Sequence, residues 1–379
     1  MKIRRFWLGR IQSLWAKRSV VWLSGVRRVG KTTLCRAIEG TEYFDCELPS
    51  TRRLLEDPES FLRDLQKKTV VLDEIHRLGD PAQLLKIAAD HFQSTRIIAT
   101  GSSTLGASAK FRDTLAGRKA ELWLTPMIAA DLDAFGNTSL GHRFLHGGLP
   151  PFFLAREFPE REIQEWLDAY WAKDIQELFR LERRHSFQKF VELLMANSGS
   201  MFEATRYARP CEVSRTTITN YLAVLEATYV VHVVRPFSTH RPTEIVSAPK
   251  TYGFDTGFVC HYRGWDQLRR EDMGALWEHW VLNEMNARLQ TRNIQYWRDK
   301  QGHEIDFIVA RSRKAPIAIE CKWSADAFTP SALQVFRRQY AHGENYVVAN
   351  DVSRAYRRHI NDIEVRFVNL AGLMDLLGA

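Results

Sequence analysis

The sequence predicts an α/β protein that begins with a parallel β-sheet. Up to about residue 140, short apolar runs alternate with amphipathic helical patterns, which is typical of buried parallel strands joined by right-handed helical crossovers. The chain has 379 residues, which is too long for one ordinary domain, so two or three domains are expected. It has no run of eighteen apolar residues, so no membrane-spanning helix is expected.

The first segment, residues 1–140, carries the elements of this sheet. Each expected strand is a short run of mostly apolar residues, and each expected helix has apolar residues on one face. A cluster of glycines and prolines between residues 136 and 151 marks the end of the segment. The strands are expected at Val20–Ser24, Tyr43–Cys46, Thr69–Asp73, Arg96–Thr100 and Glu121–Leu124, and the helices at Lys31–Glu39, Pro58–Lys67, Pro81–Phe92 and near Ser108–Leu115.

Two further segments follow. Residues 150–245 are mostly helical in pattern and become β-branched at Tyr229–Val234. Residues 250–379 begin with an expected helix near Gly274–Leu289 and then return to strands, at Gln295–Arg298, Glu304–Ala310, Pro316–Lys322 and Tyr346–Ala349. The sequence therefore predicts three domains, at residues 1–140, 150–245 and 250–379.

Charge and cysteine content limit which partners and which cellular compartment are expected for the protein. The formal net charge is +8, and ten Lys and Arg residues stand in residues 1–36 with no acid before Glu39. Such a basic start can meet nucleic acid or nucleotide phosphates, with a solvated basic face as the alternative. The five cysteines are scattered and form no CxxC pair, which favours a reducing, cytoplasmic setting over disulfides or a zinc site.

The segment between the first strand and the first helix predicts a phosphate-binding loop. Residues 20–33 read VVWLSGVRRVGKTT, which fits G-x-x-x-x-G-K-[ST] after an apolar strand. Glycines let backbone N–H groups surround the phosphates, Lys31 is expected to reach the β- and γ-phosphates, and the Thr32 hydroxyl is expected to ligate Mg²⁺. The expected ATP-binding residues are Gly25, Val29, Gly30, Lys31, Thr32 and Thr33.

A second motif supports the phosphate-binding loop. Thr69–Glu74 reads TVVLDE, a buried strand that ends in two carboxylates. Two adjacent acids at the end of an apolar strand are costly unless a cation or a water molecule requires them. We expect Asp73 to hold Mg²⁺ through water and Glu74 to polarise the attacking water.

Three more residues are candidates for contact with the γ-phosphate. The strand Arg96–Thr100 continues into IIATGSS, so Thr100 or Ser102 is a candidate γ-phosphate sensor, with a plain Ser/Gly turn as the alternative. Arg118 is a candidate arginine finger that acts within the chain or across the boundary of a homo-oligomer. An ordinary surface arginine is the alternative for Arg118.

These motifs resemble those of the AAA-type P-loop ATPases of bacteria and archaea that carry a C-terminal domain of unknown function. The likeness rests on GVRRVGKTT, VVLDEIH, ATGSS and LAGRKAELWLTPM. It continues through GGLPPFF, WAKDIQELFR and TYGFDTGF, so it covers nearly the whole chain. The resemblance implies an ATPase core, a winged-helix middle domain and a restriction-endonuclease-like C-terminal domain.

The middle segment has the pattern of a helix-turn-helix. We expect a helix at Met201–Arg209 and a second at Arg215–Ala227, with Ser214 as its N-cap and Tyr229–Val234 as a wing strand. The start of the second helix in such motifs meets bases and phosphates. A helical bundle that transmits the nucleotide state or contacts another subunit is the alternative. The expected DNA-binding residues are Arg215, Thr216, Thr217 and Asn220, opposite a buried stripe of Ile218, Tyr221, Leu222 and Leu225.

The C-terminal segment carries a charged pattern on two expected strands. EIDFIV and IAIECKW are separated by the polar turn Arg311–Lys314, which places Asp306 on one strand of a hairpin and Glu320 with Lys322 on the next. With Glu278 on the preceding helix, the order resembles the PD-(D/E)xK nucleases. In that reading the three carboxylates bind one or two Mg²⁺ or Mn²⁺ ions and Lys322 is catalytic. A salt-bridged network on an inactive scaffold is an equal alternative.

Two functions of different classes fit these observations. The first is a Mg²⁺-dependent ATPase that binds and remodels or processes DNA in repair, recombination or defence, with a nuclease-like C-terminal domain whose cleavage activity stays open. The second is a nucleotide-gated binding or signalling switch whose C-terminal domain is an inactive docking scaffold. Neither function calls for a membrane partner.

Overall fold

The computed structural model describes residues 2–101, 109–176, 183–238, 248–310 and 315–378 of the chain. These residues form two compact units, one of residues 1–184 and 223–230 and the other of residues 185–222 and 231–379. The division passes through helix α15 (Arg215–Ala227), between Leu222 and Ala223. The predicted boundary near residues 245–250 falls within the second unit, and the three-domain division stays a prediction.

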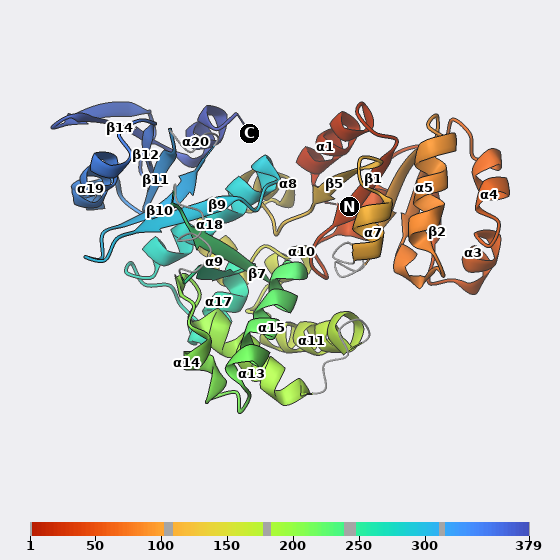
Figure 1. Cartoon of the computed structure of the whole chain (residues 1–379), viewed down its shortest axis with the longest axis horizontal. Coiled ribbons are helices and arrows are strands. Elements are labelled where there is room, and N and C mark those ends of the chain that lie inside the picture. Colours follow the sequence, from red (N-terminus) through yellow and green to blue (C-terminus); the bar gives the residue numbers. More distant parts are fainter. Residues whose placement is uncertain (1, 102–108, 177–182, 239–247, 311–314, 379) are drawn as a thin grey trace. The chain divides into compact units, whose positions relative to one another are not determined.

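A five-stranded parallel sheet forms the centre of the first unit (Figure 1). All of its neighbouring strand pairs are parallel, so the carboxyl ends of the strands meet along one edge. The fold class predicted from the sequence is confirmed here, and three of the five strands have the predicted bounds. The strand order is β2 (Thr41–Asp45), β3 (Thr69–Asp73), β4 (Arg96–Thr100), β1 (Val20–Ser24) and β5 (Lys119–Trp123).

Two helices of the first unit begin at an aspartate that caps them. The Asp57 side chain accepts a hydrogen bond from the backbone of Ser60, and that of Asp80 accepts one from the backbone of Gln83. A proline stands in the first turn of each of these helices, where its missing N–H costs nothing. The helices are α1 (Arg5–Trp15), α2 (Lys31–Arg36), α3 (Pro49–Leu54), α4 (Pro58–Asp64), α5 (Pro81–His91), α7 (Ala109–Thr114), α8 (Ala129–Phe135), α9 (Leu140–His146), α10 (Pro150–Phe153) and α11 (Glu160–Tyr170), with the short turns η1 (Ile75–Arg77) and η2 (Trp171–Ile175).

The basic opening of the chain is partly structural. It folds as α1, which the sequence did not predict and which packs against β1 and β5. Arg4, just before it, is only 3% exposed and pairs with Asp131 at 2.6 Å. The same guanidinium donates to the carbonyl oxygens of Val29 at 3.1 Å and Thr125 at 2.8 Å. At least one of the ten early cations therefore fixes the phosphate-binding loop to the body of the unit rather than facing solvent.

A nine-stranded mixed sheet forms the second unit; its C-terminal strands are the blue arrows in Figure 1. The predicted hairpin is present as an antiparallel pair, although its turn, residues 311–314, lies outside the described residues. The predicted wing run forms a strand that pairs with one neighbour in parallel and with another antiparallel. The strand order is β13 (Tyr356–Ile360), β14 (Ile363–Val368), β12 (Asn345–Ala349), β11 (Ile317–Lys322), β10 (Glu304–Val309), β9 (Ile294–Arg298), β7 (Val231–Pro236), β8 (Lys250–Gly253) and β6 (Ser200–Met201).

The helices of the second unit include one that is buried on nearly every side. This helix, α18, packs against β11 and α20, and its Trp277 donates to the carbonyl of Val348 at 3.0 Å. No described helix is long and apolar enough to cross a membrane. The helices are α13 (Arg184–Ala196), α14 (Ala204–Ala208), the first part of α15, α17 (Thr256–Arg263), α18 (Met273–Leu289), α19 (Ser331–Gln339) and α20 (Leu370–Leu376), with the turn η3 (Ala325–Ala327).

Candidate functional site

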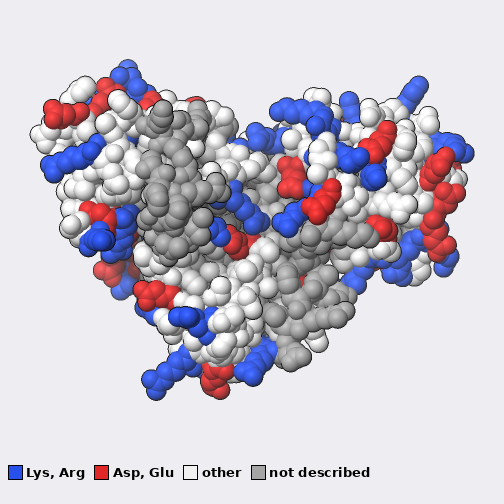
Figure 2. All heavy atoms as spheres, viewed as in Figure 1, with Lys and Arg blue, Asp and Glu red and all other residues white. Residues whose placement is uncertain are grey.

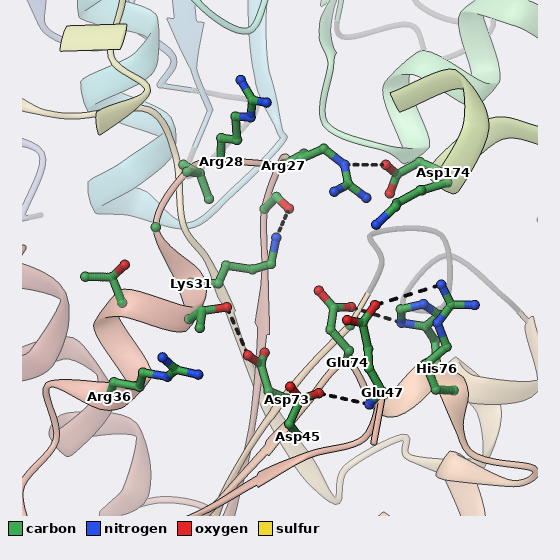
Figure 3. A pocket seen from close by; sticks show the side chains of 18 of the residues that line it. Arg27, Arg28, Lys31, Arg36, Asp45, Glu47, Asp73, Glu74, His76 and Asp174 are labelled. Carbon is green, nitrogen blue, oxygen red and sulfur yellow. Dashed lines mark hydrogen bonds and ion pairs between the residues drawn. The ribbon is translucent and has the colours of Figure 1, made fainter. Parts of the chain in front are cut away.

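The first unit contains a cavity of about 490 Å³ at the carboxyl edge of its parallel sheet. Its wall includes Gly25 after β1, Asp45 at the end of β2, Asp73 at the end of β3 and Gly101 after β4. Basic and acidic side chains meet around it (Figure 3). This edge is where open α/β sheets bind their ligands. We call this space the phosphate cavity.

The loop between β1 and α2 has a backbone that only glycine fits at two points. Gly25 has φ 142°, and a Cβ atom there would come within 2.4 Å of the carbonyl oxygen of Leu124. Gly30 has φ 102°, in the range that glycine adopts at little cost. Lys31 follows, and its Nζ donates to the carbonyls of Gly25 at 2.8 Å and Val26 at 3.2 Å. The Lys31 side chain is thus folded back onto the backbone of the loop.

The ammonium of Lys31 is half-buried, and its charge is costly in this position. Burial lowers the pKa of Lys31, against the opposing charges of Glu74, Asp174 and Asp73. The two carbonyl groups accept hydrogen bonds from two of its three N–H donors but carry no full negative charge. An anionic ligand in the phosphate cavity would therefore stabilise the charged lysine.

Asp73 is the point at which several predicted residues converge. Its Oδ2 atom accepts a hydrogen bond of 2.9 Å from Thr32 Oγ1 and another from the hydroxyl of Tyr43. Its Oδ1 atom accepts one from the hydroxyl of Thr100. Asp73 is only 4% exposed. The three hydroxyl groups therefore fix the orientation of its carboxylate.

Glu74 lies beside Asp73 in an unusual backbone conformation. Its φ of 57° is in the left-handed region, which few residues other than glycine adopt and which often marks a functional site. Its Oε2 atom is 3.1 Å from Nδ1 of His76. Burial by itself would raise the pKa of Glu74, but the hydrogen bond from His76 and the charge of Lys31 lower it overall. The carboxylate is therefore held in its ionised form.

The structure brings together most of the residues predicted for ATP. Thr100 is fully buried behind the two acids, where its hydroxyl also accepts from the backbone N–H of Glu74 at 3.1 Å. Arg118 is not in the cavity wall, because its guanidinium pairs with Asp90 at 2.8 Å. Ser102 lies outside the described residues. Those that line the phosphate cavity are Gly25, Val29, Gly30, Lys31, Thr32, Thr33, Asp73 and Glu74.

Among the wall residues that were not predicted from the sequence, four make contacts that bear on the site. Tyr43 and His76 touch the two acids directly, while Arg27 pairs with Asp174 at 3.3 Å across 147 positions of the chain. The signals for them were weak. Tyr43 lies on the strand next to β3, His76 stands in VVLDEIH, and Asp174 stands in WAKDIQELFR, where it marked a resemblance without a role.

An apolar cavity of about 380 Å³ adjoins the phosphate cavity in the same unit. The two share Gly30, Thr33 and the prolines at 150 and 151. The remaining wall of the apolar cavity includes Ile3, Leu34, Phe135 and Leu154. A charged space next to an apolar one matches the two ends of a nucleotide, its phosphates and its base.

Helix α15 displays the residues predicted to contact DNA. Arg215, Thr216 and Asn220 are exposed, while Thr217 is half-buried and its backbone N–H donates to Ser214 Oγ at 3.0 Å. Ser214 is therefore the N-cap, as predicted. The predicted buried stripe is also confirmed, at Ile218, Tyr221, Leu222 and Leu225.

The second unit contains a cluster of acids and lysines on its sheet and on α18. Lys322 Nζ lies 2.6 Å from Glu320 Oε2 and 3.4 Å from Asp306 Oδ2. Asp306 also accepts a hydrogen bond of 2.7 Å from the backbone N–H of Cys321. We call these residues and their neighbours the acidic cluster, which consists of Glu278, Glu304, Asp306, Glu320, Lys250 and Lys322.

Lys250, which was not predicted, is the second cation of the acidic cluster. It is 5% exposed, and its Nζ lies 3.2 Å from Glu278 Oε1 and 2.7 Å from Glu304 Oε1. The hydroxyl of Tyr252 donates to the same oxygen of Glu278. The sequence offered one hint, since Lys250 directly precedes the TYGFDTGF motif.

Crowded negative charge perturbs the acidic cluster. Burial, together with the charge of Asp306, raises the pKa of Glu320 to about 8 despite Lys322. The same two causes raise the pKa of Glu278 despite Lys250. Within the described part of the chain, no three His, Cys, Asp or Glu side chains are arranged to hold a metal ion. The predicted second Mg²⁺ or Mn²⁺ therefore finds no ready-made ligand set, because lysines occupy the space between the carboxylates.

Family models match three consecutive parts of the chain. Residues 17–132 match an AAA domain, residues 137–269 a domain of unknown function, DUF8612, and residues 273–368 another, DUF4143. Two uncharacterized proteins, from Mycobacterium bovis and Mycobacterium tuberculosis, are each 29% identical over 346 residues, which is 88% of this chain and 76% of theirs.

Solved structures also resemble this chain. A Walker-type ATPase of Pyrococcus abyssi is 17% identical and aligns over 69% of this chain and 96% of its own, with a TM-score of 0.45. The ORC1 protein of Aeropyrum pernix, solved in complex with DNA, is 14% identical and aligns over 69% of this chain and 92% of its own, with a TM-score of 0.28.

Proposed function

We infer that this chain, which carries an AAA domain followed by a DUF4143 domain, hydrolyses ATP with Mg²⁺. One observation carries the inference: Lys31, Thr32, Asp73 and Glu74 converge on one cavity of about 490 Å³. The adjoining apolar cavity offers room for the base of the nucleotide. Phosphoryl transfer needs positioning and charge stabilisation more than covalent chemistry, and these residue types supply both.

Thr32 in the first turn of α2 and Asp73 at the end of β3 fit a magnesium ion. The Thr32 hydroxyl and the Asp73 carboxylate lie 2.9 Å apart in the wall of the phosphate cavity, and both are oxygen ligands of the kind Mg²⁺ prefers. When bound, the ion neutralises phosphate charge. Tyr43 and Thr100 act as positioning residues, because their hydroxyl groups orient Asp73.

The remaining steps belong to Lys31 and Glu74. Lys31 exchanges the loop carbonyls for the phosphate oxygens, which gives its charge an anionic partner. Glu74 orients the attacking water, with His76 fixing its carboxylate. The lowered pKa of Glu74 keeps its carboxylate ionised at neutral pH, where it can accept a hydrogen bond from that water.

Replacing Glu74 by glutamine is expected to slow ATP hydrolysis about a hundredfold or more while ATP binding is kept, because the amide cannot accept the proton. A steady-state phosphate-release assay, combined with equilibrium ATP binding, measures both effects. Glu59→Gln, an exposed acid paired with Arg63, is the control and should change neither. Full hydrolysis by the Glu74→Gln variant would remove Glu74 from the mechanism.

We further propose that DNA is the partner and that the start of α15 contacts it. Support comes from the exposed Arg215, Thr216 and Asn220 at the start of a capped second helix. Figure 2 shows basic and acidic side chains interspersed over the visible face. Binding would therefore depend on such local features rather than on a broad basic surface on this face.

Duplex DNA binding by the full chain is expected to weaken steeply between low and moderate salt. Arg215→Ala should weaken it about three- to tenfold and make the dependence on log salt shallower by about one unit. Fluorescence anisotropy with a labelled duplex measures both values. Arg338→Ala, an exposed arginine of α19, is the control. If the parent chain shows no salt-dependent duplex binding, the protein-docking switch replaces the DNA partner.

A second candidate activity belongs to the acidic cluster. Asp306, Glu320 and Lys322 meet on two adjacent strands, which is the observation that favours metal-dependent cleavage of phosphodiester bonds. Lys322 would orient the water, and the carboxylates would bind the ion once it displaces their lysine partners. Lys250 would then neutralise Glu278 and Glu304 or help to hold a phosphate.

A further inference from the structure

An ion pair joins the phosphate-binding loop to a π-helical turn inside the phosphate cavity. Arg27 Nε lies 3.3 Å from Asp174 Oδ2, and both residues line the cavity together with Lys31. Figure 3 shows the Arg27 guanidinium directed at Asp174. The Arg27 side chain is 30% exposed and that of Asp174 is 13% exposed, so an incoming ligand can reach the pair.

This ion pair is not needed to hold the loop against α11. The indole Nε1 of Trp166 already donates to the carbonyl of Arg27 at 3.0 Å. The neighbouring Arg28 pairs with Glu165 of α11 at 3.9 Å. The Arg27–Asp174 pair is therefore an additional charged contact. It lies in the wall of the phosphate cavity, where a bound triphosphate would also lie.

A carboxylate is a poor neighbour for a triphosphate. Both are anions, and within the cavity both would compete for Arg27, which has five donors in a planar fork suited to phosphate. Burial raises the pKa of Asp174, although the charges of Arg27 and Lys31 oppose the shift. The ionised carboxylate of Asp174 is therefore less stable here than in water. ATP binding would favour an exchange in which Arg27 leaves Asp174.

The turn that carries Asp174 is connected to the end of α15. Turns of this π-helical kind are rare and occur often at functional sites. Tyr170, directly before it, makes a buried hydrogen bond of 2.5 Å with Thr228, just after α15. The next residue, Tyr229, receives a hydrogen bond of 3.1 Å from Ser24 at the end of β1. All of these contacts lie in the first unit.

We propose that Arg27 is a phosphate-binding residue that Asp174 holds aside until ATP arrives, and that the exchange of partners shifts the turn Trp171–Ile175 against Thr228. The proposal rests on the proposed ATP site. It assigns the arginine of that site to the loop itself rather than to Arg118, which pairs with Asp90. It also gives the bound phosphate a direct route to the end of α15.

Equilibrium binding of fluorescent ATP and ADP to the full chain with Mg²⁺ tests the first part. Arg27→Ala should weaken ATP binding about tenfold or more, and ADP binding less, because a charged hydrogen bond to phosphate is lost. Asp174→Asn should instead tighten ATP binding about fivefold, because Arg27 no longer has a competing anion. Glu162→Gln, which changes an exposed acid of α11 outside the cavity wall, is the control and should stay within twofold of the parent.

Hydrogen–deuterium exchange tests the second part with a readout independent of turnover. ATP should change the exchange of peptides covering residues 168–176 and 223–230 in the parent chain. In Asp174→Asn these peptides should already exchange as in the ATP-bound parent before nucleotide is added. Weaker ATP binding by Asp174→Asn would overturn the proposal, because Asp174 would then support the ATP-binding state.

The outcomes separate this proposal from the ATP site on which it rests. If the parent chain binds no ATP, the proposed function fails. If the parent binds ATP and loses it on Lys31→Ala, while Arg27→Ala binds ATP as the parent does, only the role of Arg27 and Asp174 fails. Unchanged exchange of residues 223–230 on ATP binding would remove the route to α15.

Discussion

Lys31→Ala is expected to abolish ATP hydrolysis and to weaken ATP binding about tenfold or more. In the proposed ATP site the lysine meets the phosphates, and each charged hydrogen bond to them is worth about 1.5–3 kcal/mol. In the structure its ammonium donates hydrogen bonds to the carbonyls of Gly25 and Val26. Alanine offers nothing in exchange, so the triphosphate loses a full positive charge at the centre of its site. Phosphate release and nucleotide binding measure the two losses.

This variant should fold as well as the parent. Burial lowers the pKa of Lys31, which means that the folded protein bears a cost for the charged side chain. Removing it should leave the melting temperature unchanged or slightly higher, as is common where function requires a strained group. Lys68→Ala, which breaks an exposed pair with Glu42, is the control and should keep full activity. Full ATP hydrolysis by the Lys31→Ala variant would refute the assignment of the cavity.

The sequence could predict the phosphate-binding loop and the two acids after β3 because the signals for these residues are local. The loop motif fixes Lys31 and Thr32 by spacing alone, and the apolar run before Asp73 and Glu74 predicts both the strand and the place where it ends. Parallel strands then bring their carboxyl ends to one edge. Asp73 and Thr32 meet at 2.9 Å for this reason, although 41 positions separate them.

The rest of the site depends on tertiary contacts that carry no local signal. Nothing in the sequence distinguishes Arg27 from other loop arginines. Asp174 contacts it only because the turn after α11 folds back on the phosphate cavity. Arg118 stays a candidate finger across a subunit boundary, and within this chain its side chain pairs with Asp90 on α5. Composition and spacing cannot distinguish these arginines; only the packed helices do.

The second unit shows the same limit. The hairpin that joins Asp306 to Glu320 and Lys322 could be predicted from two apolar runs and their alternation. Lys250 could not, because it enters through β8, which lies beyond β9 and β7 in the sheet order. The predicted ion site therefore contains a buried cation that the sequence pattern omits. Its presence is the reason why the activity of the acidic cluster needs a direct test.

Asp306→Asn is expected to stop Mg²⁺- or Mn²⁺-dependent DNA cleavage while ATP hydrolysis continues at the parent rate. The amide keeps the size of the side chain, and its oxygen can still accept from the backbone N–H of Cys321, so the hairpin should be preserved. It cannot supply the charge that a divalent ion requires. Nicking of a supercoiled plasmid measures cleavage, and Asp326→Asn, an exposed acid of the same unit, is the control.

The melting temperature with and without Mn²⁺ distinguishes a metal-binding nuclease site from an inactive scaffold, and no DNA is needed for this measurement. The charge of Asp306 raises the pKa of Glu278 and Glu320, but it also raises the pKa of Lys250 and Lys322. Without metal its removal therefore relieves repulsion between the acids and weakens attraction to the lysines, so the melting temperature at neutral pH should change little. In a live site Mn²⁺ stabilises the parent chain by binding the folded state, and Asp306→Asn loses that gain. If Lys250 and Lys322 neutralise the cluster permanently, Mn²⁺ leaves both melting temperatures unchanged and the parent cuts no DNA. That pair of results would assign the acidic cluster to a docking scaffold, because its carboxylates would then serve only their partners within the protein, such as Lys250, Lys322 and Tyr252.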